Sequence, residues 1–183
     1  VIMYGMIVIS LFFWQLCAEI TEHPANPRYY AIFQEERGTI YDRNGLALAS
    51  SIGSEEVYQR KYAEPSLSHT VGYFHQRYGI TGLERLYHEE LIGGRSVFTT
   101  LDLKLQQVAA AALGNSTGAV VAVNPVTGGI LALVSSPWVD ANTLEDNWPD
   151  YLADLRSPFL NRATQGLYPP GSVVKPIVYA AAM

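Results

Sequence analysis

The sequence predicts an α+β protein with an N-terminal transmembrane helix followed by two soluble units. Three observations carry this prediction: an uncharged apolar run at 1–18, an Asn44-Gly45 turn between two apolar-patterned runs, and a helical pattern followed by two strand-like runs at 119–134. We expect an anchor at 1–20, a small unit built on a β-hairpin at 21–97, and a second unit at 98–183.

The anchor prediction depends on the length of the apolar run at 1–18 and on its lack of charged residues. Residues 1–18 carry no charge, and Glu19 is the first charged side chain. A run of this length favours a membrane-spanning helix over a buried core helix. It ends in bulky residues around Trp14 and Leu16, unlike a signal-peptide cleavage site, so we expect an uncleaved anchor. The chain begins with Val and has no basic flank, so we expect it to be cut at its N-terminus, and charge asymmetry gives no orientation.

The first soluble unit begins with the hairpin at 37–49. Asn and Gly both tolerate positive φ, which two-residue hairpin turns require. A third strand is predicted at 57–62. A helix is predicted at 82–91, where Thr81 and Glu84 have the spacing of a capping box.

The second unit begins with a helix that Thr100 caps and that runs to Leu113. Its predicted apolar face is formed by Leu101, Leu105, Val108 and Ala112. Two antiparallel strands follow at 119–123 and 130–134, joined by a turn at 124–129. Both runs are almost wholly apolar, so we expect a sheet that is covered on both faces. One short helix is predicted to begin near Pro149.

Near the C-terminal end, Ser172 and Lys175 form a Ser-x-x-Lys pair behind a Pro-Pro-Gly turn. Three positions apart on a helix, the two side chains share one face. A helix that begins at about Ser172 places the hydroxyl beside unpaired backbone N–H groups and the positive end of the helix dipole. Burial would lower the pKa of Lys175 and make it a general base for Ser172. Pro176 predicts an irregular first turn.

Composition excludes several classes of function. A net charge of −5 and a pI near 5.3 leave no basic patch for nucleic acid. The four histidines have no metal-ligand spacing, and the single Cys17 lies in the apolar run. We predict no metal and no organic cofactor. The Ser-x-x-Lys pair by itself is weak evidence for a catalytic site, because chance yields on the order of 0.2 such pairs in a chain with this composition.

Five stretches together are far more specific. In chain order they are RGTIYDRNGLALA at 37–49, TTLDLKLQQ at 99–107, GAVVAVNPVTGGILALVSSP at 118–137, NRA at 161–163 and YPPGSVVKP at 168–176. The order of these stretches and their amino-acid sequences resemble those of the class B penicillin-binding proteins, the membrane-anchored transpeptidases that cross-link peptidoglycan.

The resemblance implies a pedestal (dimerisation-type) domain at 21–97 and the beginning of a transpeptidase domain of the serine β-lactamase-like fold at 98–183. It implies that Ser172 is acylated by the D-Ala-D-Ala stem peptide and by β-lactams, with Lys175 as proton acceptor. The implied partners are peptidoglycan stem peptides, β-lactams, the membrane and a SEDS-family glycan polymerase. The implied location is the cell membrane, with a single span and the soluble part outside the cytoplasm.

Two departures from the family pattern matter. The family often carries Thr-Phe where this chain has Val173-Val174, and we expect both valines to face the core. The family's Ser-x-Asn and Lys-Thr-Gly motifs have no counterpart in these 183 residues, so we expect the chain by itself to be catalytically inactive.

Two other functions fit the same residues. One is a β-lactam sensor, which uses the Ser-x-x-Lys chemistry to transmit a signal. The other is a non-catalytic scaffold whose anchor and pedestal regulate a membrane glycan polymerase.

Overall fold

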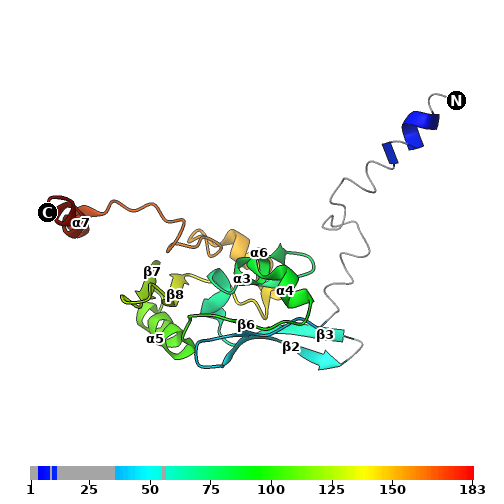
Figure 1. The fold of residues 1–183 in the computed structure, drawn as a ribbon, viewed down its shortest axis with the longest axis horizontal. Helices are drawn as coiled ribbons and strands as arrows, with labels where there is room; N and C mark the ends of the chain where they lie inside the picture. The colour runs from blue at the N-terminus through cyan, green and yellow to red at the C-terminus, as the bar shows by residue number, and fades with distance from the viewer. Residues whose placement is uncertain (1–3, 9, 12–35, 55–56) are drawn as a thin grey trace.

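The computed structural model describes residues 4–8, 10–11, 36–54 and 57–183 (Figure 1). Most of the predicted anchor at 1–20 lies outside these residues, as does the stretch from 21 to 35. Residues 4–8 and 10–11 are helical and exposed. Among the described helices, none combines the length and the apolar character that crossing a bilayer requires.

The predicted hairpin is confirmed. Strand β1 (Ile40–Tyr41) pairs antiparallel with β2 (Ala47–Ser54), and Gly45 has φ 80° in the turn between them. The predicted third strand is β3 (Val57–Tyr62), which pairs antiparallel with β2.

One strand of this sheet was not predicted. Strand β6 (Val97–Phe98) lies parallel to β1 and completes the order β3-β2-β1-β6. Two residues are too few to show a period-2 pattern, so no local sequence signal marks this strand.

The predicted helix at 82–91 is two short helices, α3 (Gly82–Leu86) and α4 (His88–Ile92). Tyr87 between them has φ −107° and ψ 32°, which is not helical. The capping box is wrong as well. The Thr81 hydroxyl accepts from the N–H of Tyr73 at 3.1 Å, and Glu84 is fully buried in an ion-pair cluster. Before these helices lie the 3₁₀ helix η2 (Pro65–His69) and the short ribbon of β4 (Phe74–His75) and β5 (Gly79–Ile80).

The next predicted helix is present as α5 (Leu103–Leu113), but Thr100 does not cap it. The cap is Asp102, whose Oδ1 accepts from the N–H groups of Lys104 and Leu105 at 3.1 and 3.2 Å. The Thr100 hydroxyl instead donates to the carbonyl of Ile130 at 2.7 Å.

The predicted apolar face of α5 is only half right. Leu101 is buried and Leu105 is half-buried, but Val108 and Ala112 are exposed. The buried side chains of the helix are Gln106, Ala109 and Ala110. The buried polar Gln106 explains the error, because a pattern based on hydrophobicity places glutamine on the solvent side.

The two predicted strands are confirmed as β7 (Gly118–Val123) and β8 (Ile130–Ser136), which pair antiparallel. The expectation of a sheet covered on both faces is wrong for β7, where Val121 and Val123 are about half exposed. The outer edge of β8 is closed by α5. There, the N–H of Asp102 donates to Leu131 O, and the Gln106 side chain bonds both backbone polar groups of Leu133.

The last helix before the Ser-x-x-Lys segment is α6 (Leu144–Ala153), which begins earlier than predicted and contains Pro149. The larger core cluster joins Ile40 and Leu48 of the hairpin to Leu91, Leu101 and Leu144. It draws on both sides of the predicted boundary at 97/98, which stays a prediction. The mixed helix and strand content agrees with the α+β class.

Candidate active site and the buried charge cluster

The Ser-x-x-Lys pair lies at the head of the last helix. Gly171–Val174 form the 3₁₀ helix η3, and Lys175–Ala181 form α7. Gly171 has φ 53°, and the N–H of Lys175 donates to the carbonyl of Ser172. Pro176 stands in the first turn of α7, where its missing N–H has no intrahelical partner to lose. The predicted irregular first turn is therefore confirmed, because a 3₁₀ turn that opens on a glycine with positive φ precedes the α-helix.

Both side chains of the pair are exposed. In Figure 1, α7 lies apart from the folded body at the end of an extended segment. Ser172 and Lys175 are exposed, and within the described part of the chain neither side chain has a hydrogen-bond or ion-pair partner. The burial expected around Lys175 is thus not seen here. The roles of Ser172 as nucleophile and Lys175 as base stay predictions.

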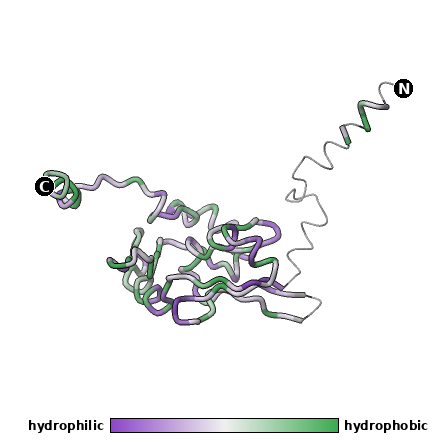
Figure 2. The backbone as a smooth tube through the Cα atoms, in the orientation of Figure 1, coloured by the Kyte–Doolittle hydropathy of each residue, from purple (hydrophilic) through white to green (hydrophobic). Residues whose placement is uncertain are grey.

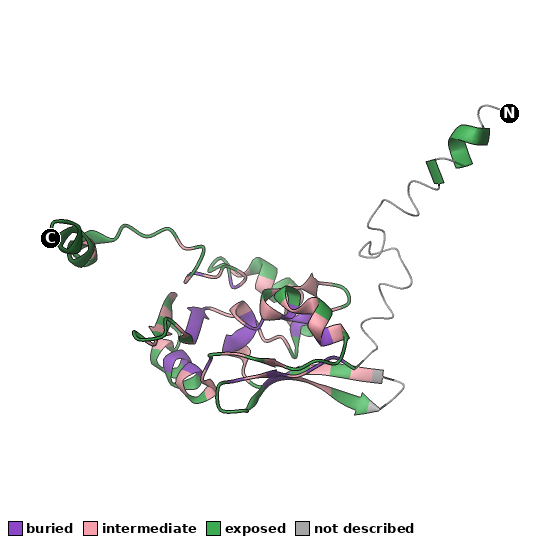
Figure 3. Cartoon of the chain, viewed as in Figure 1, coloured by how far each residue is buried: buried purple, intermediate pink, exposed green. Residues whose placement is uncertain are grey.

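The apolar residues around this pair are exposed too. Figures 2 and 3 show α7 as hydrophobic and exposed. Val173 is 77% exposed, so the expectation that it faces the core is wrong in this structure.

The NRA motif, ahead of the Ser-x-x-Lys pair, is fixed to the folded body by hydrogen bonds. Arg162 is 8% exposed, and its guanidinium donates to the carbonyl oxygens of Arg156, Ser157 and Leu160. The backbone N–H of Arg162 donates to Ser135 Oγ on β8 at 2.9 Å. The adjacent Asn161 donates to the carbonyl of His69 at 3.2 Å. The NRA motif therefore fixes the chain to β8 and η2 just before the extended segment.

A second group of functional interest is a buried charge cluster that sequence reasoning missed. Glu84 Oε2 accepts from Arg37 Nη2 at 3.0 Å, and Glu84 Oε1 accepts from Arg60 Nε at 2.6 Å. The three side chains are 4% exposed or less. The Tyr62 hydroxyl lies 3.5 Å from Glu84 Oε1 and accepts from the N–H of Phe74 at 2.7 Å. The Arg37 guanidinium lies over the Phe74 ring, 3.9 Å from its centroid.

Burial controls the ionisation of this cluster. It lowers the pKa of Arg37, although the neighbouring Glu84 carboxylate opposes that effect. Burial, together with the Glu84 charge, raises the pKa of Tyr62 well above its usual value. Tyr62 therefore stays protonated and neutral at physiological pH.

Asp42 connects the hairpin to α5. Its Oδ1 accepts from the N–H groups of Asn44 and Leu46 at 2.7 and 2.8 Å, and its Oδ2 accepts from the N–H of Leu103 at 3.2 Å. Burial alone would raise the pKa of Asp42, but these donors together lower it below its usual value. The DRNG part of the first motif thus positions the helix that supports β8.

Comparison with known proteins identifies the two halves of the chain. The penicillin binding protein A dimerisation domain matches residues 37–116, and the penicillin binding protein transpeptidase domain matches residues 118–183. The chain belongs to the class B penicillin-binding proteins. The hairpin motif falls within the first match, and the NRA and Ser-x-x-Lys motifs fall within the second.

Relatives of this penicillin-binding protein carry transpeptidase names. Peptidoglycan D,D-transpeptidase MrdA of Escherichia coli K12 is 50% identical over 49% of this chain and 15% of the relative. Peptidoglycan D,D-transpeptidase PbpA of Mycolicibacterium smegmatis is 35% identical over 87% of this chain and 40% of the relative. The chain therefore spans less than half of the length of these relatives.

Solved structures agree with the fold. The D,D-transpeptidase domain of a peptidoglycan glycosyltransferase from Eggerthella lenta is similar with a TM-score of 0.75 and 38% identity, over 81% of this chain and 37% of that one. Penicillin-binding protein A from M. tuberculosis, solved as an imipenem acyl-enzyme complex, has a TM-score of 0.75 and 33% identity, over 82% of this chain and 43% of that one.

Proposed function

We propose that this chain is part of a peptidoglycan D,D-transpeptidase that works through an acyl-enzyme on Ser172. The observation that carries the proposal is the Ser-x-x-Lys pair at the head of a helix, within the residues that the transpeptidase family matches. The names of the relatives support it, as do the solved acyl-enzyme complexes of penicillin-binding protein A with imipenem and penicillin G.

The proposed reaction is acyl transfer in two steps. In the first, the Lys175 side chain takes the proton of Ser172 Oγ, which attacks the carbonyl carbon of the penultimate D-Ala. The bond to the terminal D-Ala nitrogen breaks, and that D-Ala leaves as a free amine after accepting a proton. In the second, a stem-peptide amine attacks the ester, a new peptide bond forms, and Ser172 recovers its proton. This chemistry requires no metal and no organic cofactor.

We further propose that residues 1–20 form a single membrane anchor and that the rest of the chain lies outside the cytoplasm. The uncharged run at 1–18 supports the anchor. The peptidoglycan substrate that the relatives' names imply supports the location. In this arrangement the partners are stem peptides and β-lactams, and a SEDS-family glycan polymerase in the same membrane. Alkaline phosphatase fused after Met183 should be active in cells, and an inactive fusion with normal expression would contradict the orientation.

The test of the chemistry is acylation of the full protein by a fluorescent penicillin, followed by peptide mass mapping. The label should appear on Ser172 and disappear in Ser172→Ala, whereas replacement of the exposed Ser116 by Ala should leave it unchanged. A Lys175→Arg variant should also lose the label, because the arginine side chain stays protonated at neutral pH and cannot accept the Ser172 proton. A label on any other residue contradicts the assignment.

A further inference from the structure

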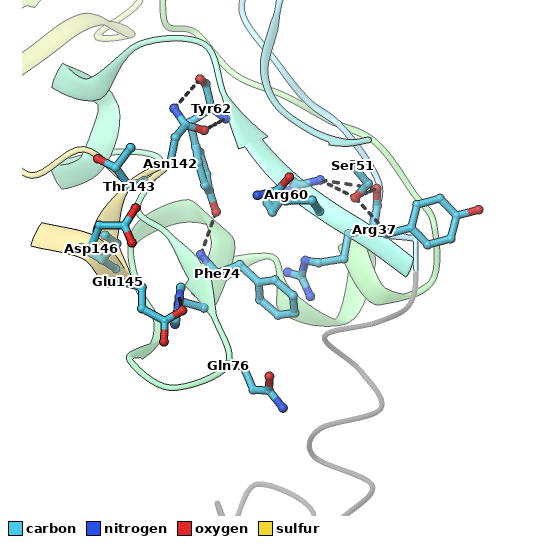
Figure 4. Close-up of a pocket in the computed structure, with 15 residues that line it drawn as sticks. Arg37, Ser51, Arg60, Tyr62, Phe74, Gln76, Asn142, Thr143, Glu145 and Asp146 are labelled. Carbon is cyan, nitrogen blue, oxygen red and sulfur yellow. Dashed lines mark hydrogen bonds and ion pairs between the residues drawn. The ribbon is translucent and has the colours of Figure 1, made fainter. Parts of the chain in front are cut away.

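A pocket of about 380 Å³ lies between strand β3 and the first turn of α6, far along the chain from Ser172 (Figure 4). This volume is in the range of small-molecule sites. Its wall is mainly polar, and the residues that matter here are Arg37, Arg60, Asn142, Glu145 and Asp146.

The inner wall carries an unbalanced positive charge. The Arg37 and Arg60 side chains are 1% and 4% exposed, and Glu84 is the one carboxylate that pairs with them among the described residues. Tyr62, the other acidic group in contact with Glu84, is neutral because its pKa is raised by burial. Among the described residues, two buried cations therefore share one buried anion. Buried charges are normally paired, because desolvation of an uncompensated ion is costly.

The same two arginines also have unused donors. Arg37 Nε and Arg60 Nη2 are buried and have no hydrogen-bond partner within the part of the chain that the structure describes. Arginine is always protonated, so each of these nitrogens carries at least one N–H that lacks an acceptor. A buried guanidinium donor without a partner is costly, and a carboxylate supplies both the missing acceptor and the missing negative charge.

The rim has the opposite sign. Glu145 and Asp146 lie on the first turn of α6 and are exposed at the mouth of the pocket. Glu145 has His75 and Arg77 as neighbours at 3.9 Å each, contacts that are long, partly exposed and correspondingly weak. These carboxylates disfavour a polyanion such as phosphate, and they favour a ligand that carries its own cation.

We propose that this pocket binds a small zwitterion, an amino acid or short peptide with a free carboxylate and a free ammonium group. The carboxylate lies against Arg37 and Arg60, and the ammonium group lies toward Glu145 and Asp146. With the ligand carboxylate bound, Arg37 and Arg60 face two anions in the interior, Glu84 and the ligand. The site is separate from Ser172, so the proposal does not rest on the transpeptidase reaction.

The test is a ¹⁵N–¹H chemical-shift titration of the full chain in detergent, with glycylglycine as the probe. The Nε–H signals of Arg37 and Arg60 should shift with a dissociation constant on the order of 1 mM or tighter. N-acetylglycylglycine and glycylglycine amide each lack one charge, and each should bind at least about tenfold more weakly. The proposal is overturned if the Arg37 and Arg60 signals do not shift as glycylglycine is added. It is also overturned if glycylglycine amide binds as tightly as glycylglycine.

Three variants separate the pocket from other surfaces. The double variant Glu145→Gln/Asp146→Asn changes exposed residues, so it should fold normally and weaken glycylglycine about tenfold while leaving the acetylated peptide unchanged. Arg60→Gln should abolish binding, and its folding is checked in the same spectra. Arg156→Gln removes an exposed arginine that pairs with Asp154, and should not change the dissociation constant of glycylglycine.

Competing ligands test the charge of the bound molecule. Inorganic phosphate or acetate binding more tightly than glycylglycine contradicts the zwitterion. Ser172→Ala should bind glycylglycine like the parent chain, so loss of acylation and loss of this site are distinguishable.

Discussion

Two motifs that mark this family are held in very different ways. In the hairpin motif at 37–49, Arg37, Ile40 and Asp42 are each no more than 2% exposed and are fixed by contacts with distant parts of the chain. In the motif at 168–176, Ser172 and Lys175 are exposed and have no side-chain partner within the described residues. Spacing along the chain thus specifies which groups are available, whereas contacts from other elements decide whether those groups are positioned.

The surroundings of Ser172 indicate what that positioning requires. The exposed side chains of η3 and α7 include Val173, Ile177, Val178 and Tyr179. A helix that is apolar all round is typical of a buried helix. We therefore expect the active arrangement of Ser172 and Lys175 to depend on apolar packing around α7. The following substitutions test the contrast between the two regions, beginning with the largest expected change in the free energy of unfolding.

The largest effect is expected for Glu84→Gln. This change removes the only carboxylate that pairs with the buried Arg37 and Arg60 side chains among the described residues. Breaking a buried ion pair by removing one partner typically costs about 3–5 kcal/mol. Urea unfolding monitored by circular dichroism measures it. Glu89→Gln on the exposed side of α4 is the control and should change the free energy of unfolding by less than about 0.5 kcal/mol. Equal effects of the two variants would show that the cluster does not stabilise the fold.

The second effect is expected for Gln106→Leu. The Gln106 amide donates to the carbonyl oxygens of Ser66 and Leu133 and accepts from the N–H of Leu133. Leucine fits the volume but leaves these buried backbone groups without that partner, which should cost about 2–4 kcal/mol. Gln107→Leu is the matched control on the exposed face, where the Gln107 side chain donates to Glu64 at 3.4 Å and has no other hydrogen-bond partner among the described residues. A stable Gln106→Leu protein would mean that water replaces the amide at the edge of β8.

The sequence was informative where local chemistry decides the structure. The Asn44-Gly45 turn, strand β3 and the pair β7 and β8 all follow from turn residues and runs of apolar residues. The irregular turn ahead of α7 follows from Pro176 in the same way.

Most of the misassigned polar residues share one cause. Glu84 and Gln106 were misassigned or overlooked because each side chain is fixed by partners far away in the sequence. Thr81 and Thr100 had the spacing of caps, but distant groups compete for their hydroxyls. Buried polar residues are thus where a single sequence is least informative, and the charged wall of the β3–α6 pocket was invisible for that reason.

The third effect depends on pH. Asp42→Asn should cost about 1–3 kcal/mol at pH 7, because an amide cannot accept the bonds from Asn44, Leu46 and Leu103 as a carboxylate does. The folded-state pKa of Asp42 lies below its unfolded value, so its stabilisation is present above about pH 4 and is lost as the pH falls through the folded pKa. The parent chain should therefore lose stability on acidification below about pH 4 more steeply than Asp42→Asn. Asp102→Asn is the control, because asparagine caps a helix about as well as aspartate.

The smallest effect distinguishes the two regions most directly, because the same substitution is made in both. Val134 on β8 is fully buried, and Val134→Ala should cost about 2 kcal/mol through lost burial and the cavity left behind. Val173 beside Ser172 is 77% exposed, and Val173→Ala should change the free energy of unfolding of this chain by less than about 0.5 kcal/mol. Chemical denaturation of the two variants side by side gives the comparison. If Val173→Ala costs as much as Val134→Ala, the Ser-x-x-Lys segment packs against the folded body in solution, and the geometry of Ser172 and Lys175 is then already fixed within this chain.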